Sequence, residues 1–238
     1  MTSTINTIEI SSLMIILIPV AFVIWLQYKW SLDYKEGLYA ISRMLGQLLI
    51  IGYFLGTIFN TDNSWIVVLV LTVMVLVSSW IALRTVKIKR TTLYIYVLIS
   101  MLIGCLSILV FVTQGVLQLT PWYQPQTMIP LASMIFSNTM NSISLAAERY
   151  DDEMINNKNY EDARNIAFRT SLIPMINSLF AVGLVSLPGM MTGQILSGVD
   201  PLIAARYQIM VMAMIFASGG IASAVYLVLI KPNSKLKY

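Results

Sequence analysis

The sequence contains no histidine and a single cysteine, Cys105. Zinc, copper and iron sites rely largely on imidazole and thiolate ligands, so this chain has almost no candidate residues for such a site. Without histidine, neither a Ser-His-Asp nor a Cys-His catalytic set can be assembled. The P-loop motif G-x-x-x-x-G-K-[ST] does not occur, which excludes ATP binding of that kind. We therefore expect no enzyme active site and no cofactor bound by this chain.

Charged residues are scarce as well. They make up 11% of the sequence, hydrophobic residues make up 58%, and the mean hydropathy is +0.78. An ordinary soluble domain carries roughly 25% charged residues, so the composition indicates an integral membrane protein. No basic segment with a cleavage site precedes the first apolar run, which predicts that this run is a retained helix.

The apolar runs predict an all-α, polytopic protein with about seven transmembrane helices, because one spanning helix takes about 20 residues. We expect one transmembrane domain over residues 1–238. The expected spans are residues 10–25, 38–59, 65–83, 93–112 and 128–147, a sixth beginning at Ser171, and a seventh at 202–230.

The basic residues are distributed unevenly among the connections. Seven spans with the N-terminus outside place four segments in the cytoplasm, namely residues 29–37, 84–91, 148–170 and 231–238. These segments hold thirteen of the fifteen Lys and Arg residues; Arg43 lies near the inner end of the second span, and only Arg206 falls on the outer side. Lys and Arg accumulate on cytoplasmic loops, so we expect the N-terminus outside and the C-terminus in the cytoplasm. The net charge of +4 indicates orientation, and we expect no nucleic-acid partner.

The fifth span carries one polar stripe. Its members recur at helical spacing within an arc of roughly 80°: Ser133, Ser137, Asn141, Ser144 and Glu148. Small and amide residues often line helix–helix contacts in membranes, and intramembrane polar residues also mark substrate paths. Both interpretations stay open, with Asn141 the best candidate for contact with cargo.

The stretch from Ser171 to Met210 combines apolar residues with polar and helix-breaking ones. Asn177 and Ser178 lie within its first apolar part, and we expect them to line a substrate path together with Ser137, Asn141 and Ser144. Met190 and Met191 follow Pro188-Gly189; we expect them on the same substrate path, as candidate soft metal ligands. The Pro188–Pro201 connection is expected near the outer side.

The segment 148–170 is the one long polar stretch and carries ten charges at helical spacing. Two interpretations fit this segment. It is either a solvated helical connection or a cytoplasmic coupling segment that receives force from a separate ATPase. The candidate coupling residues are Glu148, Arg149, Glu161, Asp162 and Arg164. The adjacent Glu148 and Arg149 are also explained as an ordinary interfacial ion pair.

Several blocks resemble the FetB-type permeases of bacterial iron-export ABC systems and the related plant aluminium-tolerance permeases. The similar blocks are MNSISLAAER (140–149), LIPMINS (172–178), VGLVSLPGMMTGQILSG (182–198), DP (200–201), RYQI (206–209), QLL (47–49) and PWY (121–123). The resemblance spans nearly the whole chain. One departure is the segment before the sixth span, which is shorter here than in many relatives.

The resemblance implies a permease half-transporter in the bacterial inner membrane, surrounded by lipid, that forms a homodimer and exports iron. It also implies a separate ATPase subunit, on which ATP and Mg are bound. Because histidine is lacking, any metal contact would use oxygen ligands or methionine, and no metal site is assigned.

Other functions stay open beside this one. An ABC permease could move another metal or a small molecule, such as a nucleotide-sugar-like compound. A secondary transporter or channel would work without an ATPase, and a membrane scaffold would move no cargo.

Overall fold

The computed structural model describes residues 9–86 and 90–231, and within these ranges the regular elements are helices, with one isolated β-bridge between Val182 and Ser186. The expected all-α, polytopic membrane fold is confirmed. The basic residues Lys87, Lys89, Lys235 and Lys237 lie outside the described residues. The chain forms two compact units, which meet in sequence between Asn60 and Thr61.

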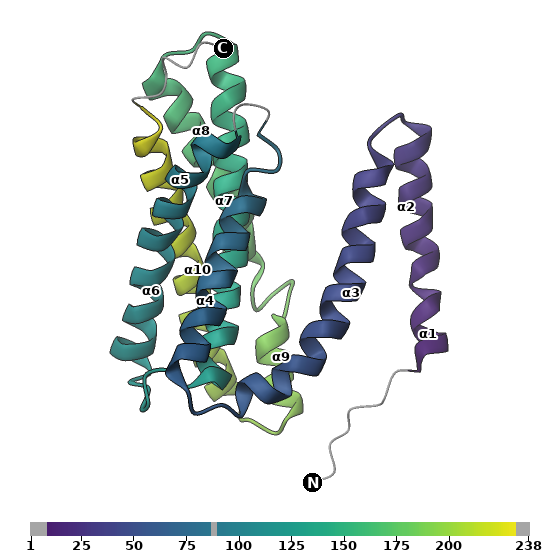
Figure 1. The fold of residues 1–238 in the computed structure, drawn as a ribbon, viewed down its shortest axis with the longest axis vertical. Coiled ribbons are helices and arrows are strands. Elements are labelled where there is room, and N and C mark those ends of the chain that lie inside the picture. The colour runs from purple at the N-terminus through teal and green to yellow at the C-terminus, as the bar shows by residue number, and fades with distance from the viewer. Residues whose placement is uncertain (1–8, 87–89, 232–238) are drawn as a thin grey trace. The chain divides into compact units, whose positions relative to one another are not determined.

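Unit 1, up to Asn60, is a helical hairpin preceded by a short helix (Figure 1). It comprises α1 (Ile10–Ile15), α2 (Leu17–Lys29) and α3 (Tyr34–Phe59). Asp33 caps α3 by accepting a hydrogen bond from the Glu36 N–H at 3.3 Å. No described side chain of unit 1 is buried, although most are apolar. Such a surface is stable in lipid, where apolar side chains need no burial in protein.

Unit 2, from Thr61, is a helical bundle. Its elements are α4 (Ser64–Ala82), a continuous run of α5 (Arg90–Met101), η1 (Leu102–Leu106), α6 (Ser107–Val110) and η2 (Phe111–Val116), then α7 (Pro125–Ile155), α8 (Tyr160–Ala181), α9 (Gly189–Leu196) and α10 (Pro201–Leu229). Two turns of the run are π-helical, η1 and η2. We refer to the four elements from Arg90 to Val116 as the 90–116 helix.

Within the described parts of the chain, five helical segments are long and apolar enough to cross a membrane: Ser12–Lys29, Tyr34–Gly56, Ser64–Ala82, Arg90–Val116 and Pro201–Leu229. The fifth and sixth expected spans fall on α7 and α8, which carry charges in one half each. With 31 residues, α7 is about 46 Å long, against about 30 Å for the hydrocarbon layer. A membrane-crossing α7 would therefore extend its charged end beyond the apolar layer; that α7 and α8 cross stays a prediction.

The segment 148–170 is a hairpin of two helix ends. Its first part completes α7, residues 156–159 turn, and its last part begins α8. Asn157 adopts a positive φ of 60°, a conformation that asparagine tolerates. Asn159 then caps α8, since its side chain accepts a hydrogen bond from the Asp162 N–H at 2.9 Å. We call residues 148–170 the charged hairpin.

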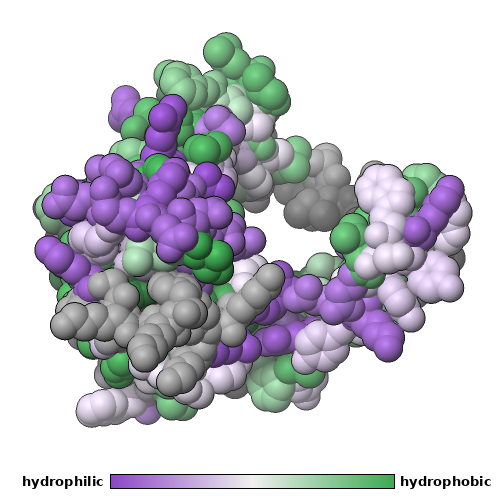
Figure 2. Space-filling view, turned by 90° about the horizontal axis from the view of Figure 1, so that it is seen from above, coloured by the Kyte–Doolittle hydropathy of each residue, from purple (hydrophilic) through white to green (hydrophobic). Residues whose placement is uncertain are grey.

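The basic residues of unit 2 gather at one end of the bundle. Thr85, just after α4, and Ser144 of α7 hydrogen-bond each other at 3.2 Å. The Tyr160 hydroxyl at the start of α8 donates to the Leu227 carbonyl near the end of α10 at 3.0 Å. Arg84, Arg90, Arg149, Lys158, Arg164 and Lys231 therefore share an end, and Figure 2 shows hydrophilic residues covering it on the larger body. We call it the basic end; Arg206, near the start of α10, lies toward the opposite end.

Helix α10 packs against α7, α8 and the 90–116 helix, and small residues permit this close packing. A Cβ added at Gly104 would lie 2.8 Å from the Ala222 nitrogen and 2.9 Å from its Cα, so only glycine allows this approach of two backbones. Nearby, the Thr139 hydroxyl donates to Ser218 Oγ at 3.2 Å, which joins α7 to α10. Cys105, beside Gly104, is fully buried.

We predict that Gly104→Ala destabilises the bundle by about 1–3 kcal/mol, the usual cost of an overpacked core. The added methyl group meets the backbone of Ala222, which cannot turn aside as a side chain can. Thermal unfolding in detergent measures the effect. Gly193→Ala is the matched control, because no other group lies within 4 Å of its Cβ position. Equal stability of the two variants would contradict the close helix contact.

Candidate functional site

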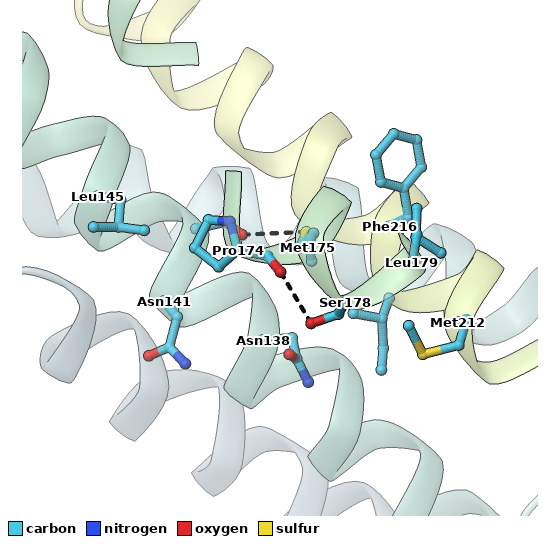
Figure 3. Close-up of a pocket in the computed structure, with 11 residues that line it drawn as sticks. Asn138, Asn141, Leu145, Pro174, Met175, Ser178, Leu179, Met212 and Phe216 are labelled. Carbon is cyan, nitrogen blue, oxygen red and sulfur yellow. Dashed lines mark hydrogen bonds between the residues drawn. The ribbon is translucent and has the colours of Figure 1, made fainter. Parts of the chain in front are cut away.

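A cavity of about 150 Å³ lies between α7, α8 and α10, and we call it the central cavity. Five of its lining side chains are apolar. The other six are polar or contain sulfur and come from all three helices: Asn138, Asn141, Ser142, Met175, Ser178 and Met212. Figure 3 shows Asn138 and Asn141 along α7, with Ser178 of α8 and Met212 of α10 across from Asn138. No charged residue lines this cavity.

The amide and hydroxyl groups of the central cavity keep free hydrogen-bonding capacity. Asn138 donates from Nδ2 to the Met134 carbonyl at 2.9 Å, which leaves its amide oxygen as an acceptor. Asn141 makes no side-chain hydrogen bond within the described residues. Ser178 donates to the Pro174 carbonyl at 2.9 Å and can still accept. The cavity thus offers neutral donors and acceptors, and it opens at the surface of the bundle, because Asn141 and Ser178 are exposed.

One wall of the central cavity depends on a three-helix contact. Ser142 of α7 donates from Oγ to the sulfur of Met175 in α8 at 3.5 Å. Met175 is 7% exposed and lies directly on Gly219 of α10, where an added Cβ would meet its Cε at 2.5 Å. None of these three residues was predicted as a site residue from the sequence. The run Ser218-Gly219-Gly220 in α10 is the signal that indicates such a close approach.

Pro174 lies inside α8, one turn before Ser178. Proline has no N–H to donate to the carbonyl of Thr170, so the helix lacks one hydrogen bond at this level. Kinks and hinges occur where such a bond is missing. The lining of the central cavity therefore includes the position at which α8 can bend most easily.

The structure brings together two of the predicted pathway residues, Asn141 and Ser178, in the central cavity. Three others lie outside its lining. Ser137 donates to the Met134 carbonyl at 3.3 Å, Ser144 pairs with Thr85 toward α4, and Asn177 is exposed on α8. The period of the helix explains the difference, because Asn177 and Ser178 are about 100° apart around α8.

A second cavity, of about 320 Å³, lies at the opposite end of unit 2, and we call it the opposite-end cavity. Its lining includes Gln124, Gln126, Thr127, Met190, Gln194 and Tyr207. The predicted soft ligand Met190 therefore lies in this cavity, whereas its neighbour Met191 does not line either of the two cavities. Among the described residues, no group of three or more His, Cys, Asp or Glu residues is placed to hold a metal ion.

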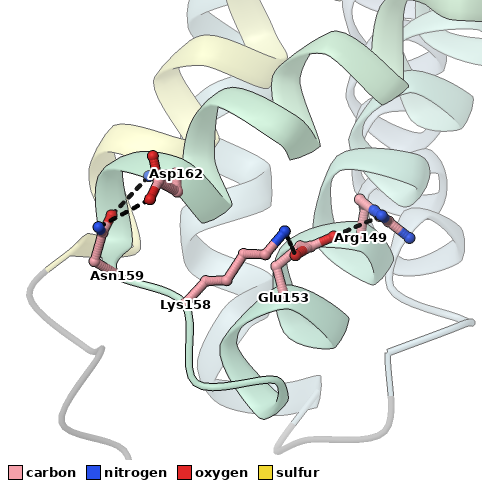
Figure 4. Close-up of polar contacts among 5 residues, drawn as sticks. All are labelled: Arg149, Glu153, Lys158, Asn159 and Asp162. Carbon is pink, nitrogen blue, oxygen red and sulfur yellow. Dashed lines mark hydrogen bonds and ion pairs between the residues drawn. The ribbon is translucent and has the colours of Figure 1, made fainter.

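The charged hairpin is fastened by a buried carboxylate (Figure 4). Glu153 contacts Arg149 Nη2 at 2.6 Å and Lys158 Nζ at 2.7 Å. Hydrogen bonding to Lys158, followed by the charges of Arg149 and Lys158, lowers the pKa of Glu153 below its usual 4.5. Arg149 thus pairs with Glu153 rather than with the adjacent Glu148, which is exposed. The carboxylate closes the hairpin across the turn at residues 156–159.

The remaining coupling candidates lie at the start of α8. Asp162 completes the helix cap, because its carboxylate accepts a hydrogen bond from Asn159 Nδ2 at 2.9 Å. Arg164 donates to Asn165 Oδ1 at 3.0 Å, and Glu161 is exposed. The exposed Glu148 and Glu161 leave carboxylates on the surface of the hairpin, where a partner can reach them.

Tyr160 connects the charged hairpin to α10. Its hydroxyl donates to the Leu227 carbonyl, and Lys231 Nζ lies 5.3 Å from the centre of its ring. The ring meets Tyr150 of α7 edge-on at 6.3 Å, and the Arg164 guanidinium lies 5.6 Å from the ring centre. Groups from α7, α8 and the end of α10 therefore contact one aromatic side chain at the basic end.

Comparison with known proteins adds the family. The sequence profile of UPF0014, described as an uncharacterised protein family, matches residues 10–233. A UPF0014 membrane protein of Synechocystis is 36% identical over 201 residues, 78% of each chain. The Escherichia coli protein named probable iron export permease protein FetB is 30% identical over 235 residues, covering 92% of this chain and 88% of its own.

A plant protein is similar over much of its length too. ALUMINUM SENSITIVE 3 of Arabidopsis thaliana is 31% identical over 224 residues, covering 87% of this chain and 80% of its own. No solved structure matches the chain significantly. The family match covers both units of the fold and each helix that lines the central cavity. The chain therefore belongs to the UPF0014 family of membrane proteins.

Proposed function

We propose that this chain is the permease subunit of an ABC-type exporter that moves iron out of the bacterial cytoplasm. The observation that carries the proposal is the central cavity. It places neutral polar groups between α7, α8 and α10, and two of these helices continue into the charged hairpin at the basic end. Intramembrane polar groups of this kind belong to substrate paths, and the name of the Escherichia coli relative supplies iron as the cargo.

The proposed power source is a separate ATPase subunit, which binds ATP and Mg and docks on the charged hairpin. In this account the basic end faces the cytoplasm of a bacterial inner membrane. The exposed Glu148 and Glu161 and the paired Arg149 and Arg164 meet the ATPase. Two copies of the chain form the transporter with two ATPase subunits.

The proposed mechanism is alternating access. Closure of the ATPase dimer pushes the charged hairpin, and the Tyr160 contacts pass that displacement to the end of α10. Helix α8 bends at Pro174, so the wall formed by Met175 and Ser178 moves against α7 and α10. The central cavity then changes the side from which it is reached. Iron is bound there only by amide and hydroxyl oxygens and thioether sulfur, and it remains a substrate rather than a resident ion.

The test is ATP-dependent accumulation of ferrous iron in inside-out vesicles that contain this chain and its ATPase. In these vesicles the cytoplasmic side faces the medium, so an exporter fills the lumen when ATP is added. Accumulation that needs ATP and both subunits supports the proposal. Iron flux that is equal without the ATPase would favour a secondary transporter, and absence of iron flux would overturn the assignment of iron as the substrate.

Within that assay, we predict that Asn141→Ala lowers the initial rate of iron transport about two- to twelve-fold, the equivalent of one hydrogen bond of about 0.5–1.5 kcal/mol. Asn177→Ala is the matched control, because both amides are exposed and Asn177 lies outside the lining of the central cavity. We expect the control to transport at the wild-type rate. Equal rates for both variants would remove the central cavity from the path.

We also predict that Tyr160→Phe uncouples iron transport by this chain from ATP hydrolysis by the partner subunit. Phenylalanine keeps the ring contacts with Tyr150 and Lys231 but removes the hydrogen bond to the Leu227 carbonyl. The iron moved per ATP hydrolysed should fall about two- to twelve-fold, while ATP hydrolysis continues. Tyr53→Phe, at an exposed position of α3, should leave this ratio unchanged. A proportional loss of transport and hydrolysis would contradict the role of Tyr160 in coupling.

A further inference from the structure

An open cavity of about 370 Å³ lies on unit 2 between α4 and the 90–116 helix, and we call it the side groove. Its lining side chains are apolar except for the hydroxyl of Thr72 and the indole N–H of Trp122. The Thr72 hydroxyl donates to the Val68 carbonyl of its own helix at 2.8 Å, so it offers no free donor to the groove. The side groove therefore suits an apolar occupant.

Both walls of the side groove are long and apolar enough to cross a membrane, over Ser64–Ala82 and Arg90–Val116. Part of the lining is exposed, for example Leu76, Leu102 and Val110 at 40%, 36% and 56%. The chain belongs to a family of membrane proteins. A groove of this kind on the surface of spanning helices is in contact with the acyl chains of lipids.

A basic and aromatic cluster lies between the same two helices at the basic end. Arg90 Nη2 donates to the Trp80 carbonyl, and the Arg90 guanidinium carbon lies 4.0 Å from the centre of a Trp80 ring. Tyr94 meets Trp80 edge-on at 5.8 Å, and its hydroxyl donates to the Leu76 carbonyl at 3.2 Å. Leu76 also lines the side groove. Among the described residues, no carboxylate pairs with Arg90.

The cluster and the groove follow one another along α4 in a fixed order. The charge of Arg90 comes first, then the amphipathic rings of Trp80 and Tyr94, then the apolar groove. From Trp80 to Val68, α4 rises about 18 Å, a little more than half of the roughly 30 Å hydrocarbon layer. Tryptophan and tyrosine rings lie at the headgroup level of membranes. A phospholipid in one leaflet has the same order of phosphate, ester groups and acyl chain.

We propose that Arg90 and the side groove bind one anionic phospholipid from the leaflet at the basic end. The Arg90 guanidinium, held in place by Trp80, donates to the phosphate, a ligand that its planar set of N–H groups fits. One acyl chain lies along the groove against α4 and the 90–116 helix. The basic residues at this end favour an anionic headgroup over a zwitterionic one, because the latter has no net charge.

Lipid binding to the full chain, delipidated in detergent, tests the proposal. Phosphatidylglycerol and phosphatidylcholine with identical acyl chains are titrated separately, and native mass spectrometry measures the dissociation constant of the first lipid bound. We expect phosphatidylglycerol to bind more tightly by about fivefold, which corresponds to the ~1 kcal/mol that one basic residue gains at an anionic surface. Equal constants for the two lipids would overturn the proposal.

Arg90 variants test the headgroup contact. Arg90→Gln should bind both lipids equally, whereas Arg90→Lys keeps the charge and should retain part of the preference for phosphatidylglycerol. The matched control Arg206→Gln removes the same charge from an exposed position at the opposite end of unit 2 and should keep the full preference. An undiminished preference in Arg90→Gln would contradict the site.

The groove itself is tested by filling it. Thr72→Phe and Val68→Phe place a ring in the groove and should each weaken the binding of both lipids about fivefold or more, since two displaced methylene groups alone account for this at about 0.8 kcal/mol each. Val73→Phe, exposed on α4 outside the lining, is the matched control and should bind as the wild type does. Unchanged binding in both groove variants would contradict the proposal, and Val68→Phe keeps the test valid if Thr72→Phe does not fold.

The same spectra reveal the rival occupant, a second copy of this chain. A dimer that Thr72→Phe dissociates, in a protein that shows no preference for phosphatidylglycerol, would make the side groove a contact between subunits and would overturn the lipid site.

Discussion

The close packing of α10 is the constraint on which the bundle depends. Two glycines allow it, Gly104 beneath the backbone of Ala222 and Gly219 beneath the side chain of Met175. Because α10 lies this close to its neighbours, Thr139 and Ser218 can hydrogen-bond across the interface, and Met175 can accept from Ser142. The same contacts form a wall of the central cavity. The same side chains therefore pack α10 and form the cavity wall, so a substitution that changes the packing also changes the shape of the cavity.

The two ends of unit 2 differ in chemistry. The basic end carries the charged hairpin, closed by Glu153 between Arg149 and Lys158, and Tyr160 ties it to α10. The opposite end contains an uncharged cavity, lined by leucine and proline side chains together with amide, hydroxyl and thioether groups. Charged side chains thus gather at the basic end, whereas none lines the cavity at the other end. Helix α10 spans the distance between them.

Much of the fold could be predicted, because apolar runs in the sequence indicate the spans and clusters of basic residues indicate which helix ends lie together. The lipid-facing spans follow from residues such as those of α4, and the clustering of Arg84, Arg90 and Arg149 indicates one shared end. Asn141 and Ser178 were predicted as lining residues because amide and hydroxyl groups are costly in lipid and are usually found where they serve a substrate path. Their neighbours Asn177 and Ser137 share that chemistry but point elsewhere, and only the rotation of each helix decides this.

The contacts that the sequence did not reveal depend on pairing between distant helices. Nothing local to Gly219 indicates that Met175 will lie on it, and Ser144 pairs with Thr85 across 59 positions. The charged hairpin was expected as a connection, yet its turn at Asn157 and the partner choice of Arg149 follow from tertiary geometry. The Pro188–Pro201 connection was expected near the outer side, but the cavity that Met190 and Gln194 line there depends on the positions of α7 and α10.

The central claim is that the central cavity is reached from different sides in different nucleotide states. Cys105 is the one native cysteine, so Cys105→Ala combined with Asn141→Cys gives a single reporter in the cavity. Labelling with a membrane-impermeant thiol reagent from the basic end is compared with and without trapped ATP on the partner subunit. The account predicts rapid labelling without nucleotide and protection with trapped ATP. Labelling at the same rate in both states, or none in either, would contradict it.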